Sequence, residues 1–257
     1  MHGIIIKDDR RYDYCEEYLK NKGFTFGGEE SIDFAIFPFM SDVDEEKYDD
    51  DFFAGLKKDV IIFSGIKNAY LSAQCEKNML EYHAVITMPC VATKNAIPTS
   101  EGVIAYLISN RKQTIANSRI LVVGYGICGK DLCTRLKALG ANVSALVRNR
   151  EKEAAAYANN ITPLFIDNIF EGEAFDVIIN TVPSLVFSNE MLDKTNNALL
   201  IDIASKPYGF DMEYAKKLNK DSALLQGIPG KHAVQTAGEI FGNYIKTKSL
   251  QDKKRGS

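Results

Sequence analysis

The chain has 257 residues, of which 46% are hydrophobic and 25% are charged, and its formal net charge is −3. This length suffices for one large or two modest domains with a substantial core. Acidic and basic residues are mixed along the chain, which excludes the basic footprint of proteins that bind nucleic acid or anionic membranes. Small polar molecules are therefore the expected ligands.

The five cysteines show neither the CxxC spacing nor the Cys/His spacing of a metal site. Their odd number predicts free thiols in a reducing cytoplasm, and no metal is expected. The apolar run Ile4–Ile6 is too short for the core of a signal peptide, and no stretch approaches the roughly 18 apolar residues of a membrane span. We therefore expect a cytoplasmic protein without a membrane partner.

The first part of the chain alternates strand and helix patterns, which predicts a parallel sheet. Strands are expected at 3–7, 32–37, 59–63 and 82–87, and helices at 11–22 and 68–80. The turn Ser64-Gly65-Ile66-Lys67-Asn68 follows a strand and opens a helix, where open α/β sheets bind ligands. Ser64, Gly65 and Asn68 are thus candidates to bind a substrate carboxylate, unless Ser64 and Asn68 only cap the helix.

A further helix is expected at 98–110, opened by Pro98 and the cap-type residues Thr99 and Ser100. The unpaired amides of a helix start suit a carboxylate, so Thr99 and Ser100 are also candidates to bind substrate. Because this helix directly precedes a second α/β pattern, we expect it to bridge two domains.

Residues 118–148, around which the chain is organised, predict a βαβ unit. An apolar run at 119–123 leads through Gly124-Tyr125-Gly126-Ile127-Cys128-Gly129 into a helical pattern at 130–139, and a second apolar run follows at 142–147. In a dinucleotide-binding unit the first glycine permits the tight turn, the second admits the pyrophosphate, and the third lets the helix pack on the strand. The predicted cofactor contacts here are Gly124, Gly126, Ile127, Cys128 and Gly129.

The end of the second strand of this unit bears on the choice between NAD and NADP. NAD enzymes usually place Asp or Glu there to bind the ribose hydroxyl. This chain has Arg148, Asn149 and Arg150, with no acid before Glu151. The pattern favours the 2′-phosphate of NADP, with NAD as the other option. The alternative interpretation is a pair of solvated surface arginines.

Further strands expected at 161–166, 176–180, 198–203 and 222–226 complete a doubly wound sheet of six strands. Two of the strand ends supply the remaining predicted cofactor contacts, which are Asn180, Thr181, Val182, Pro183, Ala204 and Ser205. Lys206 is a candidate to bind an acidic substrate or, equally, an exposed loop lysine. His232 is a candidate for proton transfer, but the sequence identifies no partner for it.

The expected fold class is α/β, with two Rossmann-like or flavodoxin-like domains. The C-terminal one has a doubly wound parallel sheet that binds a dinucleotide, and a last helix crosses back to the first domain. The expected ranges are 1–97 for a substrate-side domain, 98–110 for the bridging helix, 117–234 for the NAD(P)-binding Rossmann domain, 235–248 for the crossing helix and 249–257 for a polar tail. We also expect a cleft that closes on the cofactor.

Several motifs resemble those of a known family, the A subunits of dipicolinate synthase. In the family's order they are VIIFSGIKNAYL at 60–71, NAIPTSEG at 95–102, NTVPS at 180–184, DIASKP at 202–207, and Pro229-Gly230 followed by TAG at 236–238. The SGIxNAYL and IPTxEG pieces are far more specific than a glycine-rich turn. The first 58 residues match the family poorly.

The resemblance implies a two-domain oxidoreductase that makes dipicolinate from a dihydrodipicolinate-level lysine-pathway intermediate while reducing NADP. It implies the mother cell of a sporulating bacterium as the location, a small dicarboxylate as substrate and the flavoprotein-like B subunit of dipicolinate synthase as partner; a homo-oligomer is also expected. In the family's motifs Ser64, Asn68, Thr99, Ser100 and Glu101 face the cofactor. Lys231 and His232 depart from the apolar residues expected there, so the proton acceptor stays unassigned.

Two other functions fit the same patterns. One is another two-domain NADP-dependent dehydrogenase of a small acid, similar to shikimate dehydrogenase, although the Lys and Asp catalytic pair of such enzymes is not found in the first domain. The other is a non-catalytic subunit that senses a dinucleotide. An intact, donor-lined pocket opposite the nicotinamide would argue against this second alternative.

Overall fold

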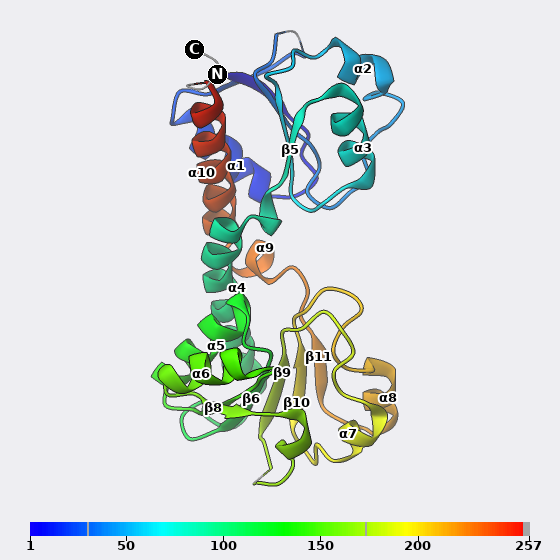
Figure 1. Cartoon of the computed structure of the whole chain (residues 1–257). Helices are drawn as coiled ribbons and strands as arrows, with labels where there is room; N and C mark the ends of the chain where they lie inside the picture. The colour runs from blue at the N-terminus through cyan, green and yellow to red at the C-terminus, as the bar shows by residue number, and fades with distance from the viewer. Residues whose placement is uncertain (30, 173, 254–257) are drawn as a thin grey trace. The chain divides into compact units, whose positions relative to one another are not determined.

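The computed structural model describes residues 1–29, 31–172 and 174–253 (Figure 1). The chain divides into two compact units. Unit 1 comprises Met1–Asn95 and Pro229–Ser257, and unit 2 comprises Ala96–Ile228. Each unit has its own parallel sheet, so the expected α/β class with two Rossmann-like sheets is confirmed.

Unit 1 contains a five-stranded parallel sheet in the order β2-β1-β3-β4-β5. Its strands are β1 (His2–Ile5), β2 (Thr25–Phe26), β3 (Phe34–Ile36), β4 (Ile61–Ser64) and β5 (Glu81–Ala84). This is the strand order of flavodoxin-like sheets, which bind ligands outside the carboxyl ends of the strands where the order reverses. In unit 1 that reversal lies between β1 and β3.

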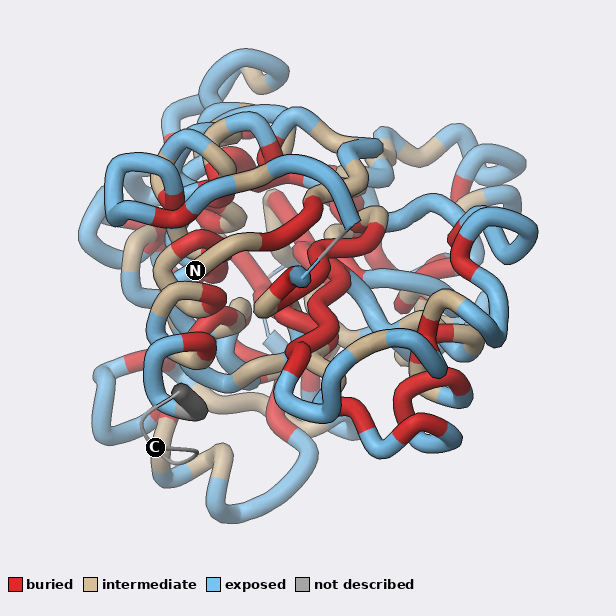
Figure 2. The backbone as a smooth tube through the Cα atoms, turned by 90° about the horizontal axis from the view of Figure 1, so that it is seen from above, coloured by how far each residue is buried: buried red, intermediate tan, exposed pale blue. Residues whose placement is uncertain are grey.

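Helices cover both faces of the sheet of unit 1, because successive residues of a strand point to opposite faces. Phe34 and Ile36 of β3 pack in one core and Ala35 in the other. The first core is covered by α1 (Arg11–Lys20) and α10 (Val234–Lys253), and the second by α2 (Asp50–Gly55) and α3 (Ala69–Asn78). Figure 2 colours the buried residues of the chain red.

Unit 2 contains a six-stranded parallel sheet in the order β11-β10-β9-β6-β7-β8. Its strands are β6 (Arg119–Val123), β7 (Asn142–Leu146), β8 (Thr162–Leu164), β9 (Val177–Asn180), β10 (Leu199–Asp202) and β11 (Ser222–Leu224). This is the doubly wound order of dinucleotide-binding folds, which places the ligand crevice at the carboxyl ends of β6 and β9.

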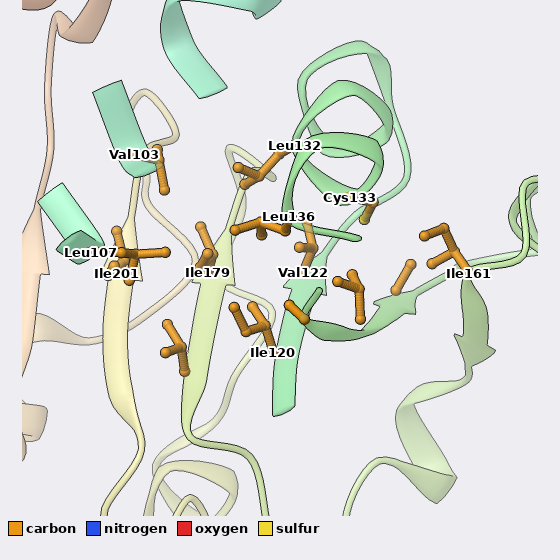
Figure 3. Close-up of a cluster of buried hydrophobic side chains, with 14 of the residues drawn as sticks. Val103, Leu107, Ile120, Val122, Leu132, Cys133, Leu136, Ile161, Ile179 and Ile201 are labelled. Atoms are coloured by element: carbon orange, nitrogen blue, oxygen red, sulfur yellow. The ribbon is translucent and has the colours of Figure 1, made fainter. Parts of the chain in front are cut away.

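The main core of unit 2 packs α4 and α5 on one face of this sheet (Figure 3). Leu132 and Leu136 of α5 lie with Val103 of α4 against Val122 and Ile179 of the strands, and all five are buried. The opposite face carries α7 and α8. The helices and short helical turns not yet bounded are η1 (Val85–Thr87), α4 (Pro89–Asn110), α5 (Ile127–Ala138), α6 (Arg150–Ala158), η2 (Ile166–Asn168), α7 (Asn189–Asp193), α8 (Met212–Lys217) and α9 (Ile228–His232).

Two helices differ from the sequence expectation. The helix expected at 98–110 begins at Pro89 and passes through Pro98, because Val91 and Ala96 are buried and their packing outweighs the backbone hydrogen bond that a proline forfeits. Thr99 and Ser100 therefore do not start a helix. The helix expected at 235–248 runs from Val234 to Lys253, and residues 254–257 of the expected tail lie outside the described residues. No helix among the described residues is long and apolar enough to cross a membrane.

Candidate functional site

Two glycines of the turn between β6 and α5 are required by the protein itself. Gly124 has φ +93°, a backbone conformation that favours glycine, and a β-carbon there would also press on Val182 and Thr181. A β-carbon on Gly129 would overlap the carbonyl oxygen of Gly124. Gly129 therefore lets α5 lie close against the end of β6.

Gly126 differs, because nothing in the folded unit requires a glycine there. Its φ of −85° suits any residue, and no described atom lies within 4 Å of the position of an added β-carbon. Gly126 is also the residue before α5, and no described side chain caps this helix start. The space and the uncapped backbone amides are what a pyrophosphate needs.

Arg148, Asn149 and Arg150, which lie between β7 and the first turn of α6, make different contacts. Asn149 caps α6, its side chain accepting a hydrogen bond from the amide of Lys152 at 2.9 Å. Arg150 donates to both carboxylate oxygens of Glu153 at 2.8 Å. Arg148 is exposed, and within residues 1–29, 31–172 and 174–253 no side chain pairs with it. Of the two arginines, only Arg148 has an uncommitted guanidinium.

A buried polar pair shapes the loops that follow β9 and β10. The Asn180 amide donates to Asp202 at 3.0 Å and to the carbonyl of Val182 at 2.9 Å. Asp202 also accepts hydrogen bonds from the amides of Ala204 at 2.9 Å and Gly209 at 2.7 Å. Asn180 and Asp202 are fully buried. Asn180 is a predicted cofactor contact, but its side-chain amide is hydrogen-bonded within the protein. Its partner Asp202 was not among the predicted site residues.

Replacing Asp202 with asparagine is expected to lower the free energy of unfolding by about 1–3 kcal/mol, the usual cost of leaving a buried hydrogen-bond donor without an acceptor. An asparagine has one acceptor oxygen, so either the Ala204 or the Gly209 amide would face an NH₂ group. Urea unfolding measures this loss, with the exposed Asp221 replaced by asparagine as the control. Equal stability of the two variants would show that Asp202 does not hold these loops.

The other predicted cofactor contacts lie on the same loops and on the first turn of α5. Thr181 donates its hydroxyl to the carbonyl of Val123 at 2.8 Å, which joins the β9 loop to β6. Burial raises the pKa of the Cys128 thiol, so this thiol is neutral at neutral pH. Of the remaining predicted contacts, Ile127, Pro183 and Ser205 are exposed, Val182 is half-buried and Ala204 is buried.

The predicted substrate turn after β4, in unit 1, is held by its own hydrogen bonds. Ser64 is buried, and its hydroxyl lies 2.6 Å from both the Ile66 carbonyl and the Tyr82 hydroxyl. The Asn68 side chain caps α3 by accepting a hydrogen bond from the Leu71 amide at 3.0 Å. Asn68 therefore caps α3, and Ser64 holds the turn that precedes this helix.

The remaining predicted substrate residues are placed differently. Gly65 lies under the Phe39 ring, where a β-carbon would overlap the ring atoms. Ser100 is buried in unit 2, and its hydroxyl finds no hydrogen-bond partner in the described part of the chain. Thr99 is half-buried on the same helix. Lys206, after β10, is exposed, and it makes no ion pair with the described residues.

His232 is exposed at the end of α9 in unit 1. Among the residues that the structure describes, none forms a hydrogen bond or ion pair with its ring. A general base is usually oriented by a hydrogen-bonded partner, and unit 1 supplies none here within its described residues.

Two surface pockets of unit 2 lie at the other edge of its sheet. One, of about 370 Å³, is lined by Arg119, Asn142 and Thr162, which stand at the starts of β6, β7 and β8. The second, of about 770 Å³, also lies at the amino ends of strands. Open α/β sheets bind their ligands at the carboxyl ends, so neither pocket is the predicted site.

Comparisons with known proteins agree with this arrangement, although no protein-family model matches the chain. The chain is 35% identical to the dipicolinate synthase A subunit of Bacillus subtilis (strain 168) over 190 residues, which are 72% of this chain and 63% of the relative. The match thus spans less than two thirds of the relative's length.

Solved structures extend the comparison to the whole fold. The crystal structure of the dipicolinate synthase A subunit from Bacillus subtilis superposes with a TM-score of 0.90 at 25% identity, covering 99% of this chain and 97% of that chain. The NAD-complexed D-isomer specific 2-hydroxyacid dehydrogenase from Lactobacillus delbrueckii ssp. bulgaricus shares the fold, with a TM-score of 0.66 at 14% identity over 100% of this chain and 98% of that chain. In sequence and in fold, the chain is therefore a relative of the dipicolinate synthase A subunit.

Proposed function

We propose that this chain is an NADP-dependent oxidoreductase that forms dipicolinate from a dihydrodipicolinate-level intermediate. The observation that carries the proposal is the turn at Gly126, whose open space and uncapped helix start fit a dinucleotide pyrophosphate. The similarity to the dipicolinate synthase A subunit supports the reaction class. The substrate would lose one hydride and one proton, and NADP would be released as NADPH.

Different residues of unit 2 would bind the pyrophosphate, the 2′-phosphate and the nicotinamide of the cofactor. Backbone amides at the start of α5 would bind the pyrophosphate beside Gly126, and Arg148 would bind the 2′-phosphate. The loops shaped by Asn180 and Asp202 would border the nicotinamide ring with Val182, Pro183, Ala204 and Ser205. The bound nicotinamide supplies the hydride acceptor. The aromatic product supplies driving force, so the protein mainly has to orient the reacting C–H bond.

Substrate binding remains proposed for Ser64, Gly65, Asn68, Thr99, Ser100 and Lys206. Replacing Ser100 with alanine is expected to raise the KM for substrate about tenfold or more, since a hydrogen bond to a carboxylate contributes about 1.5–3 kcal/mol. Ser64→Ala is expected to raise the KM too and to lower the melting temperature, because its hydroxyl holds the turn. NADP affinity should stay unchanged in both. Unaltered substrate kinetics in both variants would reassign the two serines as purely structural residues.

The experiment that tests the function follows NADPH and dipicolinate together. Purified protein is incubated with NADP and enzymatically made hydroxytetrahydrodipicolinate, with and without the flavoprotein-like B subunit of dipicolinate synthase, the partner that we propose. Formation of both products in equal amounts is expected. NADP binding without turnover in either mixture would favour a dinucleotide-sensing protein, and reduction of NADP with shikimate would favour the other dehydrogenase. The proposed setting is the cytoplasm of the mother cell in a sporulating bacterium, with the chain as a homo-oligomer.

A further inference from the structure

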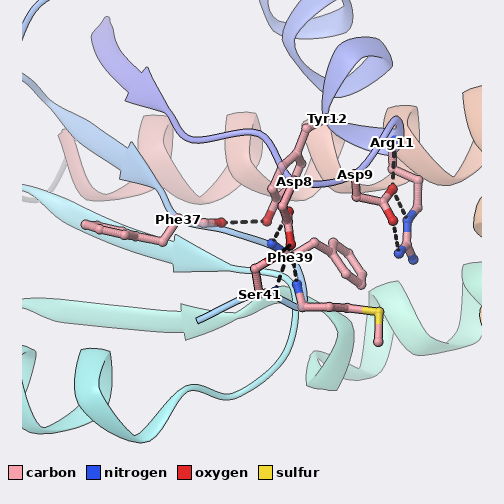
Figure 4. A network of polar contacts seen from close by, with 8 residues as sticks. Asp8, Asp9, Arg11, Tyr12, Phe37, Phe39 and Ser41 are labelled. Atoms are coloured by element: carbon pink, nitrogen blue, oxygen red, sulfur yellow. Dashed lines mark hydrogen bonds and ion pairs between the residues drawn. The ribbon is translucent and has the colours of Figure 1, made fainter. Parts of the chain in front are cut away.

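The carboxyl ends of β1 and β3 in unit 1 are tied together by one carboxylate. Asp8, after β1, accepts hydrogen bonds from the backbone amides of Phe39, Met40 and Ser41, at 2.5, 2.8 and 2.9 Å (Figure 4). Burial opposes ionisation of this group, but these amides outweigh it and lower the pKa of Asp8. The loop that carries Phe39 is therefore fixed beside the start of α1, where the strand order of the sheet reverses.

Arg11 lies in this place with a constrained guanidinium. Its Nε and Nη2 donate to the two oxygens of Asp9, at 2.7 and 2.6 Å (Figure 4). Its Cζ lies 3.5 Å from the centroid of the Phe39 ring. The same ring covers Gly65 in the turn after β4. The Arg11 side chain is only 4% exposed, so its planar group is held in one orientation.

One edge of that guanidinium remains unused. An arginine carries more N–H donors than one carboxylate can accept, and Asp9 occupies only the edge formed by Nε and Nη2. Nη1 has no partner among the residues that the structure describes. The free Nη1/Nη2 edge matches the two oxygens of a second carboxylate.

The two carboxylates near Arg11, those of Asp8 and Asp9, already have hydrogen-bond partners of their own. Asp8 is committed to three backbone amides and Asp9 to Arg11, so neither carboxylate is presented unpaired. Gly230 completes the surroundings. A β-carbon there would lie 3.1 Å from Nε of Arg11 and 3.3 Å from its Cζ, so glycine at this position lets the guanidinium keep its place.

We propose that Arg11 forms a carboxylate-binding site in unit 1, at the strand-order reversal of the sheet. It deepens the proposed function, on which it rests, by assigning one carboxylate of the dicarboxylate substrate to the free edge of Arg11. Phe39 and Gly65 connect this site to the Ser64–Asn68 turn. Asp9 and Phe39 position the guanidinium, and Arg11 alone contacts the carboxylate.

Calorimetric titration of the full chain with dipicolinate tests the site. Arg11→Lys keeps the positive charge but loses the planar edge, and it is expected to weaken dipicolinate binding about 10- to 100-fold. NADP affinity should not change. Arg10→Lys is the matched control, because Arg10 is the exposed neighbouring arginine, and it should bind dipicolinate like the unaltered protein.

A second variant keeps the test decisive if Arg11→Lys does not fold. Gly230→Ala retains Arg11 but forces its guanidinium to shift by a few tenths of an ångström, so it should weaken dipicolinate binding severalfold. If a folded Arg11→Lys variant binds dipicolinate with wild-type affinity, the proposal is wrong. If Arg11→Lys does not fold, wild-type affinity in Gly230→Ala overturns the proposal instead. Absence of dipicolinate binding to the unaltered protein would also overturn it. If the proposed function is wrong but the site is right, the protein will bind dipicolinate in an Arg11-dependent way without reducing NADP.

Discussion

Replacing Gly126 with valine is expected to weaken dinucleotide binding more than about 100-fold while lowering the stability of the protein much less than Gly129→Ala does. No described atom lies within 4 Å of a β-carbon added at this position, and the backbone conformation at 126 accepts any residue. The lost interactions are those of the pyrophosphate with the first amides of α5. At about 1.5–3 kcal/mol for each hydrogen bond to a charged group, losing two of them weakens binding more than about 100-fold.

Gly129→Ala is the matched control within the same turn. Its β-carbon would overlap the Gly124 carbonyl oxygen, a backbone atom that cannot rotate away. Overpacking of this kind lowers the free energy of unfolding by about 1–3 kcal/mol. Thermal unfolding and NADP titration of both variants separate the two roles. If Gly126→Val bound NADP normally, or unfolded as readily as Gly129→Ala, the assignment of Gly126 to the pyrophosphate would be wrong.

Replacing Arg148 with alanine is expected to weaken NADP binding about tenfold and to leave NAD binding unchanged. A hydrogen bond to a charged group contributes about 1.5–3 kcal/mol to binding. We use the lower end of this range because Arg148 is exposed and salt screens its charge. Fluorescence titration with NADPH and NADH at two salt concentrations measures the effect. The loss for NADPH should shrink as salt increases.

Arg150→Ala supplies the comparison, since the Arg150 guanidinium is bound to Glu153. This variant should retain the preference for NADP. Equal losses for the two cofactors in Arg148→Ala, or a larger loss of NADP affinity in Arg150→Ala, would contradict the role of Arg148. An unaltered protein that prefers NAD would contradict it as well.

The dinucleotide unit was predictable because its signals are local. The turn Gly124–Gly129 lies between an apolar strand and a helical pattern, and these three pieces are adjacent in the sequence. The strand order follows from the rules that govern parallel α/β sheets. The position of Arg148 follows from the length of the second strand alone.

The missed features depend on contacts between distant residues. Asp202 looks like any aspartate at the end of a strand in the sequence, and only the fold places the amides of Asn180 and Gly209 around it. Arg11 resembles its exposed neighbour Arg10 until Phe39 is folded against it. The start of α4 was misplaced because Pro98 usually marks a helix start, whereas burial of Val91 and Ala96 extends this helix through it.

A crystal structure of the protein grown with NADP shows directly where unit 2 binds the cofactor. We expect a pyrophosphate on the amides at the start of α5 beside Gly126, and a 2′-phosphate within hydrogen-bond distance of Arg148. A dinucleotide bound at the amino-terminal edge of the unit 2 sheet, near Arg119 and Asn142, would contradict this expectation. So would an empty α5 start at NADP concentrations that saturate the protein in solution.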